Sequence, residues 1–100
     1  MRYDKLVRDR IPEVIRGRGG NPTTHVAGED EYWLKLREKL SEEVAEFLAS
    51  ENMEEIADIL EVPDAIAAHK GFNHREVRAI KHDKAFERGR FTARIILEES

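Results

Sequence analysis

The fold is decided by residues 29–58, which read EDEYWLKLREKLSEEVAEFLASENMEEIAD. Apolar side chains recur here at spacings of three and four residues, the period of an amphipathic helix, at Trp33, Leu36, Leu40, Val44 and Phe47. The acids at 29–31 favour a helix start because they lie at the positive end of the helix dipole. We therefore predict a helix from Glu29 to about Ala49.

A second helix is predicted directly after the first. Ser50-Glu51-Asn52 interrupts the pattern, and Asn52 is a residue type that caps helix N-termini. The apolar positions of this second helix are Ile56, Ile59, Leu60 and Val62. Because the break is short, the two helices should form an antiparallel hairpin. Pro63 lacks a backbone donor, so we expect a kink or local break before Ile66 and a helix end at Gly71.

Helices are also predicted on either side of the hairpin. Asp9 can cap a helix that carries Pro12 in its first turn and ends near Gly17. Asn73 can cap another that ends at the step from Arg88 to Gly89, since glycine commonly terminates helices.

Three stretches have the composition of extended chain. Residues 3–7 could form a short extended segment, residues 23–26 a loop or brief strand, and the apolar, β-branched residues 91–97 a strand. Residues 1–100 should therefore form a single, mainly α domain. The hairpin would become a four-helix bundle on dimerisation, beside a small β-sheet made from the N-terminal and C-terminal segments.

The composition of the chain limits the kinds of site and binding partner that it can have. The chain has 100 residues, of which 40% are hydrophobic and 38% charged, and it lacks cysteine, so disulfides and thiolate metal sites are excluded. No signal peptide or run long enough to span a membrane is present, so we expect a cytoplasmic protein with no membrane partner. The net charge is −4, with basic segments at 2–18 and 70–94 around an acidic one at 29–61. This distribution of charge argues against nucleic acid as a binding partner and favours binding of a small polyanion through metal ions.

Two pairs of carboxylates carry the functional prediction. Glu43 and Glu46 are three residues apart, as are Glu55 and Asp58, so each pair shares a helix face. A turn near residues 50 and 51 would place Glu46 opposite Glu55, and Glu43 opposite Asp58. The two helices supply too few facing Lys or Arg side chains to neutralise four converging acids, whereas divalent cations would do so. Mg²⁺, with Mn²⁺ as a possible substitute, suits such oxygen ligands.

A plainer interpretation remains open. Helices rich in glutamate are common, and the same acids can form a solvated face on a non-enzymatic helical interaction module. Failure of Mg²⁺ to stabilise the fold would favour that alternative.

Three blocks of the sequence resemble a known family. Glu42-Glu43-x-x-Glu46 followed by Glu55-x-x-Asp58 is similar to the metal-binding signature of the all-α nucleoside triphosphate pyrophosphohydrolases, the MazG-like superfamily. The segments 3–13 and 84–91 are similar to the flanks of its phosphoribosyl-ATP pyrophosphohydrolase-like branch. The resemblance implies that the metal ligands are Glu43, Glu46, Glu55 and Asp58. Glu42 would be a further ligand or would help to orient the attacking water.

The basic residues are candidates for holding phosphate oxygens. Lys81, Lys84 and Arg88 are spaced to line one side of a helix, and Lys5 and Arg8 lie in the N-terminal block. The alternative is that all five are solvated charges paired with nearby acids.

These residues together predict hydrolysis of a nucleoside triphosphate, or a related nucleotide, to the monophosphate and pyrophosphate. Glu42 or Glu43 would accept the proton of the attacking water. Phosphoribosyl-ATP is an alternative substrate. One hairpin leaves too much apolar surface uncovered, and the resemblance implies dimers and tetramers, so we expect a homodimer or homotetramer.

Overall fold

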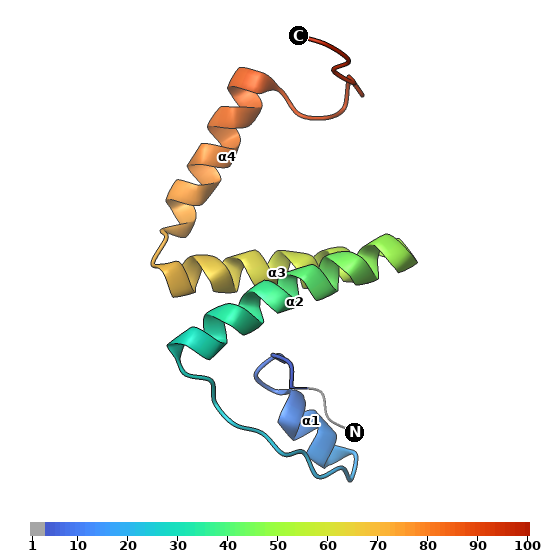
Figure 1. Ribbon diagram of the computed structural model, residues 1–100, viewed down its shortest axis with the longest axis vertical. Coiled ribbons are helices and arrows are strands. Elements are labelled where there is room, and N and C mark those ends of the chain that lie inside the picture. The colour runs from blue at the N-terminus through green and yellow to red at the C-terminus, as the bar shows by residue number, and fades with distance from the viewer. Residues whose placement is uncertain (1–3) are drawn as a thin grey trace.

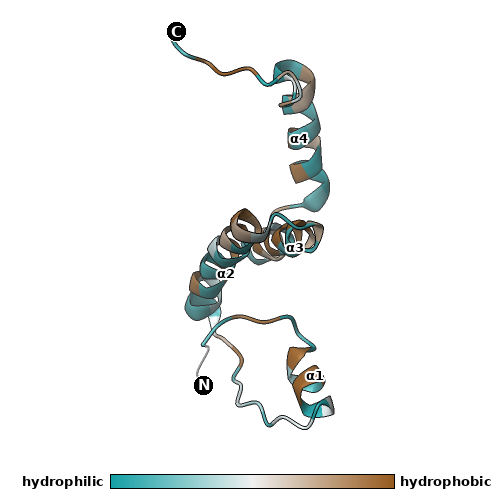
Figure 2. Ribbon diagram, turned by 90° about the vertical axis from the view of Figure 1, so that its right-hand side faces the viewer, coloured by the Kyte–Doolittle hydropathy of each residue, from teal (hydrophilic) through white to brown (hydrophobic). Residues whose placement is uncertain are grey.

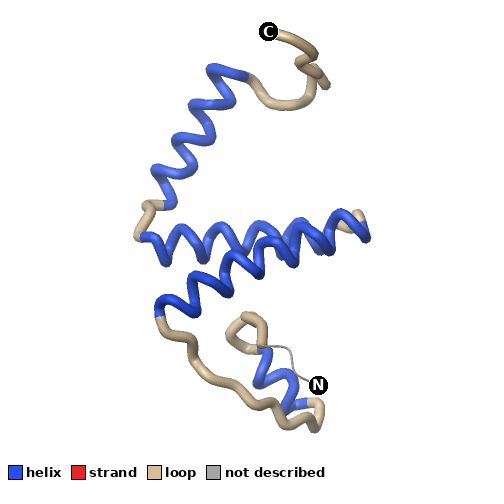
Figure 3. The backbone as a smooth tube through the Cα atoms, viewed as in Figure 1, coloured by secondary structure: helices blue, strands red, loops and turns tan. Residues whose placement is uncertain are grey.

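The computed structural model describes residues 4–100 and is mainly α-helical, as predicted. Its helices are α1 (Ile11–Gly17), α2 (Glu29–Ser50), α3 (Met53–Lys70) and α4 (His74–Arg88). Figure 3 shows these helices joined by loops, with no strand in the described part of the chain.

The predicted hairpin is confirmed. Helices α2 and α3 run antiparallel and side by side, and they make the most extensive contact between helices in the molecule (Figure 1). The reversal takes two residues: Glu51 adopts a left-handed backbone conformation with φ 56°, and Asn52 caps α3. The Asn52 Oδ1 atom accepts a hydrogen bond from the Glu55 backbone N–H at 3.3 Å. The tight turn fixes the register of the two helices, and so the placement of their acids.

Pro63 does not break α3, so the predicted local break before Ile66 was wrong. The helix continues through it for 18 residues and ends at Gly71, which has φ 73°. A proline removes only one backbone hydrogen bond, and the flanking turns of α3 remain bonded on both sides. Packing against α2, which buries Val62 beside the proline, favours the continuous helix.

The first helix also begins differently from the prediction. Arg10, not Asp9, is the residue before α1, and no side chain forms a cap hydrogen bond there. The Ile11 backbone N–H instead donates to the Arg8 carbonyl at 3.0 Å, so a backbone turn replaces the expected cap. The predicted end at Gly17 is confirmed.

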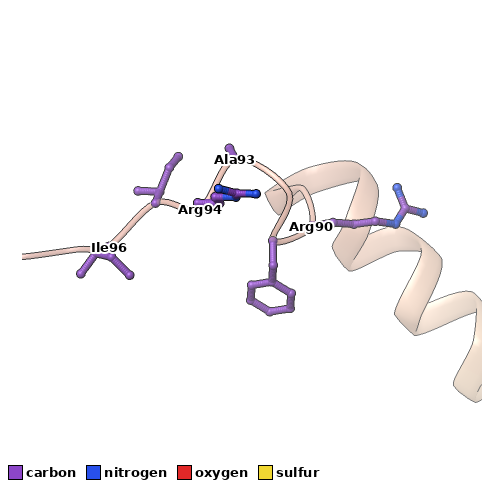
Figure 4. Close-up of a pocket in the computed structure, with 6 residues that line it drawn as sticks. Arg90, Ala93, Arg94 and Ile96 are labelled. Carbon is purple, nitrogen blue, oxygen red and sulfur yellow. The ribbon is translucent and has the colours of Figure 1, made fainter. Parts of the chain in front are cut away.

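The small β-sheet is not formed among residues 4–100, and position 3 of the expected N-terminal strand lies outside the described residues. Residues 91–97 instead make a turn, closed by a hydrogen bond from the Arg94 N–H to the Phe91 carbonyl at 3.1 Å, and then continue as irregular chain. Figure 4 shows this turn, with the side chains of Arg90, Ala93, Arg94 and Ile96 around a shallow hollow. A strand needs a partner backbone for its hydrogen bonds, and residues 91–97 are paired with no strand among residues 4–100.

Helix α4 leaves the hairpin at the Lys70 end of α3 and projects away from it (Figure 1). The radius of gyration is 17.7 Å, compared with about 13 Å for a compact chain of this length. Asn73 caps α4 as predicted, accepting from the Arg75 and Glu76 N–H groups, and Gly89 follows its last residue. One chain therefore covers little of α4.

The core of the single chain is small. Leu36, Val62 and Ala67 are its buried apolar residues, between α2 and α3. A band of apolar side chains stays exposed along the hairpin near its turn, at Val44, Leu48, Met53, Ile56 and Leu60. In Figure 2, apolar segments (brown) and hydrophilic segments (teal) follow one another along both α2 and α3. By helical angle, this apolar band lies on the face of the hairpin opposite Glu46 and Asp58.

Candidate metal site

Glu43 is the centre of the acidic cluster. It is 5% exposed. Lys39, one helical turn earlier, places its Nζ 3.0 Å from one carboxylate oxygen of Glu43. The other oxygen, Oε2, is buried and has no hydrogen-bond partner. A buried carboxylate oxygen without a partner is costly, so Glu43 presents a ligand atom that its own chain leaves unsatisfied.

Helix α3 brings two more carboxylates to the same point. Oxygens of Glu43, Glu55 and Asp58 all lie within 4.8 Å of one another. Like Glu43, Glu55 has a buried Oε2 without a hydrogen-bond partner. Each helix of the hairpin therefore supplies one carboxylate that has a buried oxygen without a hydrogen-bond partner among residues 4–100.

Glu42 and Glu46 extend the cluster along α2. Their oxygens and one of Glu43 also lie within 4.8 Å of one another. The charge of Glu43, followed by burial and the charges of Glu42 and Glu55, raises the pKa of the Glu46 carboxyl. Glu46 is exposed, so it closes the cluster on the solvent side.

The N-terminal segment supplies Lys5 to this cluster. Its Nζ donates to Glu42 Oε1 at 3.1 Å. This hydrogen bond and the charge of Glu42 raise the pKa of the Lys5 ammonium. Partial burial opposes ionisation of Glu42, but the hydrogen bond from Lys5 and the charge of Lys39 outweigh it and lower the pKa of that carboxyl.

Arg8 binds the acids of α3. Its guanidinium donates to Asp58 Oδ1 at 3.0 Å and lies 3.6 Å from a Glu61 oxygen. The side chains of this group are about half exposed, so these ion pairs hold the N-terminal segment only weakly. Lys5 thus contacts an acid of α2, and Arg8 contacts acids of α3.

The donor set fits a hard divalent cation. In this cluster Lys5, Arg8 and Lys39 face six carboxylates, Glu42, Glu43, Glu46, Glu55, Asp58 and Glu61, so negative charge remains in excess. Mg²⁺ at its usual ligand distance separates opposed oxygens by about 4 Å. Adjacent oxygens around it are only about 3 Å apart, so the oxygens of Glu43, Glu55 and Asp58, which lie within 4.8 Å of one another, would move closer together to bind it.

The arrangement of the acids differs in detail from the prediction, which placed Glu46 opposite Glu55 and Glu43 opposite Asp58. Glu43 belongs to both groups of converging oxygens, whereas Glu46 groups with Glu42 and Glu43 rather than with Glu55. The side chain of Glu43 points between the helices and reaches both acids of α3, while Glu46 lies towards solvent. The four predicted ligands are nevertheless brought to one region of the hairpin.

Three predicted phosphate-binding residues are not brought there within one chain. Lys81, Lys84 and Arg88 lie on α4, are exposed and make no ion pair with an acid of residues 4–100. Helix α4 extends away from the hairpin (Figure 1), and all three of these residues are exposed.

Two residues were missed in the sequence, Lys39 and Glu61. Lys39 is a cation of α2 that faces the acids, and its spacing of four from Glu43 was the available signal. Glu61 is three residues after Asp58, and Arg8 contacts both. Glu61 lies on the same continuous helix as Asp58, because Pro63 does not interrupt α3.

Comparison with known proteins gives one similar stretch. Over 47 residues the chain is 53% identical to a protein of Mycolicibacterium smegmatis described as uncharacterized. The stretch covers 47% of this chain and 48% of that protein, so it spans about half the length of the relative. No family model matches the chain, and no solved structure matches it. Among residues 4–100, no helix combines the length and apolar character needed to cross a membrane.

Proposed function

We propose that this chain is a Mg²⁺-dependent hydrolase that converts a nucleoside triphosphate, or a related nucleotide, to the monophosphate and pyrophosphate. The observation that carries the proposal is that the carboxylates of Glu43, Glu55 and Asp58 converge from two antiparallel helices, and that Glu43 and Glu55 each have a buried oxygen with no hydrogen-bond partner among residues 4–100. The oxygens of a solvated acidic face are bonded to water, whereas a buried oxygen without a partner can be satisfied by a bound cation.

The metal identity follows from the donor set. All the converging atoms are carboxylate oxygens, which Mg²⁺ and Mn²⁺ accept, and the open solvent side next to Glu46 leaves room for water and phosphate. The resemblance of the acidic motif to the MazG-like superfamily supports the same assignment. In this proposal Glu43, Glu46, Glu55 and Asp58 hold the cation.

Each residue of the cluster has a distinct task in the proposed reaction. A bound divalent cation would supply positive charge against the phosphate oxygens and would acidify a water molecule. Glu42 stays ionised at neutral pH because Lys5 and Lys39 lower its pKa, so it can orient that water and accept its proton. Lys5 and Arg8 lie at the rim of the cluster, where their charges can hold phosphate oxygens.

A second copy of the chain completes the proposal. The exposed apolar band of the hairpin, from Val44 to Leu60, lies away from the carboxylates, so it can pack on the same band of another copy without blocking them. Two hairpins joined in this way form a four-helix bundle, the arrangement that buries such stripes. The proposed assembly is a homodimer, or a tetramer of two such pairs, in the cytoplasm.

The test is a Mg²⁺-dependent screen of nucleoside triphosphates and phosphoribosyl-ATP for pyrophosphate release. The parent is compared with Glu55→Gln, which removes a proposed ligand charge, and with Glu54→Gln, which removes the exposed charge of its neighbour. We expect activity in the parent and Glu54→Gln and its loss in Glu55→Gln. If Mg²⁺ neither stabilises the parent nor supports release from any of these nucleotides, the chain is better described as a non-enzymatic interaction module.

A further inference from the structure

Helix α4 carries three cations on one face. Lys81, Lys84 and Arg88 follow one another at spacings of three and four residues, so they project to the same side. At about 100° per residue, Val77 lies on this face and Ile80 at its edge, and both are exposed. The face therefore carries apolar residues in the first half of α4 and cations in the second half, and residues 4–100 of the same chain cover neither part.

This face cannot serve the acidic cluster of its own chain. Asp58 lies near the start of α3, and α4 is attached beyond Lys70 at the other end, about 18 Å further along the helix axis. From that point α4 projects away from the hairpin, and it contacts α3 only slightly (Figure 1). Lys84 lies a further ten residues along α4, about 15 Å beyond the joint.

Within the described part of the chain, the acidic face of the hairpin carries carboxylates that lack cationic partners, whereas α4 carries cations that lack acidic ones. Glu46 and Glu55 make no ion pair within residues 4–100, and the buried Oε2 of Glu55 has no hydrogen-bond partner. Along the chain, strongly acidic α2 and α3 precede the basic face of α4. Opposite charges on separate elements that cannot meet within one chain can meet between two copies.

We propose that α4 of a second copy lies over the acidic face of the hairpin, so that its Lys84 and Arg88 hold the outer phosphates of the substrate bound there. Each site is then built from two chains, with carboxylates from one copy and cations from the other. The substrate class rests on the proposed function, whereas the contact between α4 and the hairpin rests on charge and exposure alone. Lys81 adds a third charge on the same face.

A heterodimer of two inactive chains tests this arrangement. One chain carries Glu55→Gln and the other Lys84→Gln with Arg88→Gln; they are co-expressed with different tags, and doubly tagged dimers are purified. In the exchanged arrangement, one of the two sites combines an intact hairpin with an intact α4, so we expect about half of the parent activity. If each site used its own α4, both sites would be defective and no activity would return. Arg75→Gln, on the opposite face of α4, is the control and should behave as the parent.

A second measurement is independent of catalysis. An equal mixture of unlabelled and ¹⁵N-labelled parent chains is dissociated, reassociated and treated with a carbodiimide, which joins a lysine to a carboxylate in contact. We expect peptides containing Lys81 or Lys84 to be joined to acidic peptides of α2 or α3 from the other isotope. Full activity of the Lys84→Gln, Arg88→Gln chain alone, or cross-links only within one isotope, would overturn the proposal. An inactive parent that still gives mixed cross-links would refute the proposed hydrolysis and leave the exchanged contact in place.

Discussion

The Lys39 ammonium lies 3.0 Å from one oxygen of the buried Glu43 carboxylate, and the other oxygen of that carboxylate has no partner. Lys39 and Glu43 are one helical turn apart on α2, and both side chains are largely buried. In the metal-free protein Lys39 thus supplies the counter-charge of Glu43 but contacts only one of its two oxygens. The remaining oxygen is available to a cation that arrives with substrate.

We predict that Lys39→Met destabilises the metal-free protein by roughly 3 kcal/mol, because it leaves a buried carboxylate without a counter-charge. The control Lys35→Met removes an ion pair with the more exposed Glu38 and should cost less than about 1 kcal/mol. Urea unfolding without metal measures both. Mg²⁺ should recover part of the loss in Lys39→Met, and equal destabilisation by the two substitutions would contradict this role for Lys39.

The pH dependence of stability should change in Glu46→Gln. The pKa of Glu46 is raised above its ordinary value of 4.5, chiefly by the charge of Glu43. A group whose pKa is raised on folding contributes stability below its unfolded pKa, and this is lost as the pH rises through the folded pKa. The metal-free parent should therefore lose this contribution between pH 4.5 and neutrality, whereas Glu46→Gln should not.

Urea unfolding of both proteins in a chelator, from about pH 4 to pH 7, checks this sign. Glu46→Gln should be at least as stable as the parent at pH 7, and the advantage should vanish near pH 4. Glu42→Gln is the opposite control, because a lowered pKa contributes stability above 4.5 that is lost on acidification. A Glu46→Gln protein less stable than the parent at pH 7 would show that repulsion from Glu43 does not dominate.

Much of the hairpin could be predicted because its signals are local. The stripe from Trp33 to Phe47 follows from helical period, and the cap at Asn52 from its side-chain chemistry. Given the hairpin, the convergence of Glu43 with Asp58 follows from their distances to the turn. These inferences need only the sequence of the two helices and of the turn between them.

The other features depend on what lies beside a segment in space. Residues 91–97 have the composition of a strand, but in one chain they have no partner backbone. Asp9 had the chemistry of a cap, but the turn at Arg8 placed the helix start one residue later than expected. The bonds of Lys5 and Arg8 to the acids link segments far apart in sequence, which no periodicity reveals.

Arg8→Gln should affect substrate binding more than stability. Its ion pairs with Asp58 and Glu61 are exposed, so we expect a cost below about 1 kcal/mol. Under the proposed function, losing one charge-assisted hydrogen bond to phosphate should raise KM about tenfold. Unfolding and steady-state kinetics are compared with Arg10→Gln, an exposed arginine at the start of α1. Equal KM values for parent and Arg8→Gln would exclude Arg8 from the phosphate site.

Glu51→Gly should stabilise the hairpin. Glu51 has φ 56°, a left-handed conformation that costs a residue with a Cβ about 1–2 kcal/mol, while glycine adopts it freely. Part of this gain is offset by the greater entropy of glycine in the unfolded chain, so we expect a net gain of roughly 0.5–1 kcal/mol. Ser50→Gly, at the last helical residue of α2, should destabilise instead. Thermal unfolding that ranks these two variants in the reverse order would contradict the assigned turn geometry.

The apolar band of the hairpin should hold two copies together. Leu48 is 71% exposed and Leu60 63% exposed in one chain, although both follow the apolar side of their helices. In a symmetric dimer both chains would bury their copies of Leu48 and Leu60 in the interface. At about 25 cal/mol per Å² of buried apolar surface, Leu48→Gln with Leu60→Gln should therefore weaken association by several kcal/mol. Light scattering at micromolar concentration should give the parent at least twice the 11.6 kDa of one chain, and the double variant a mass near that of one chain. Glu54→Gln, on the acidic side of α3, should keep the parent mass. A parent that is monomeric and fully active at that concentration would refute both the dimer and a site shared between copies.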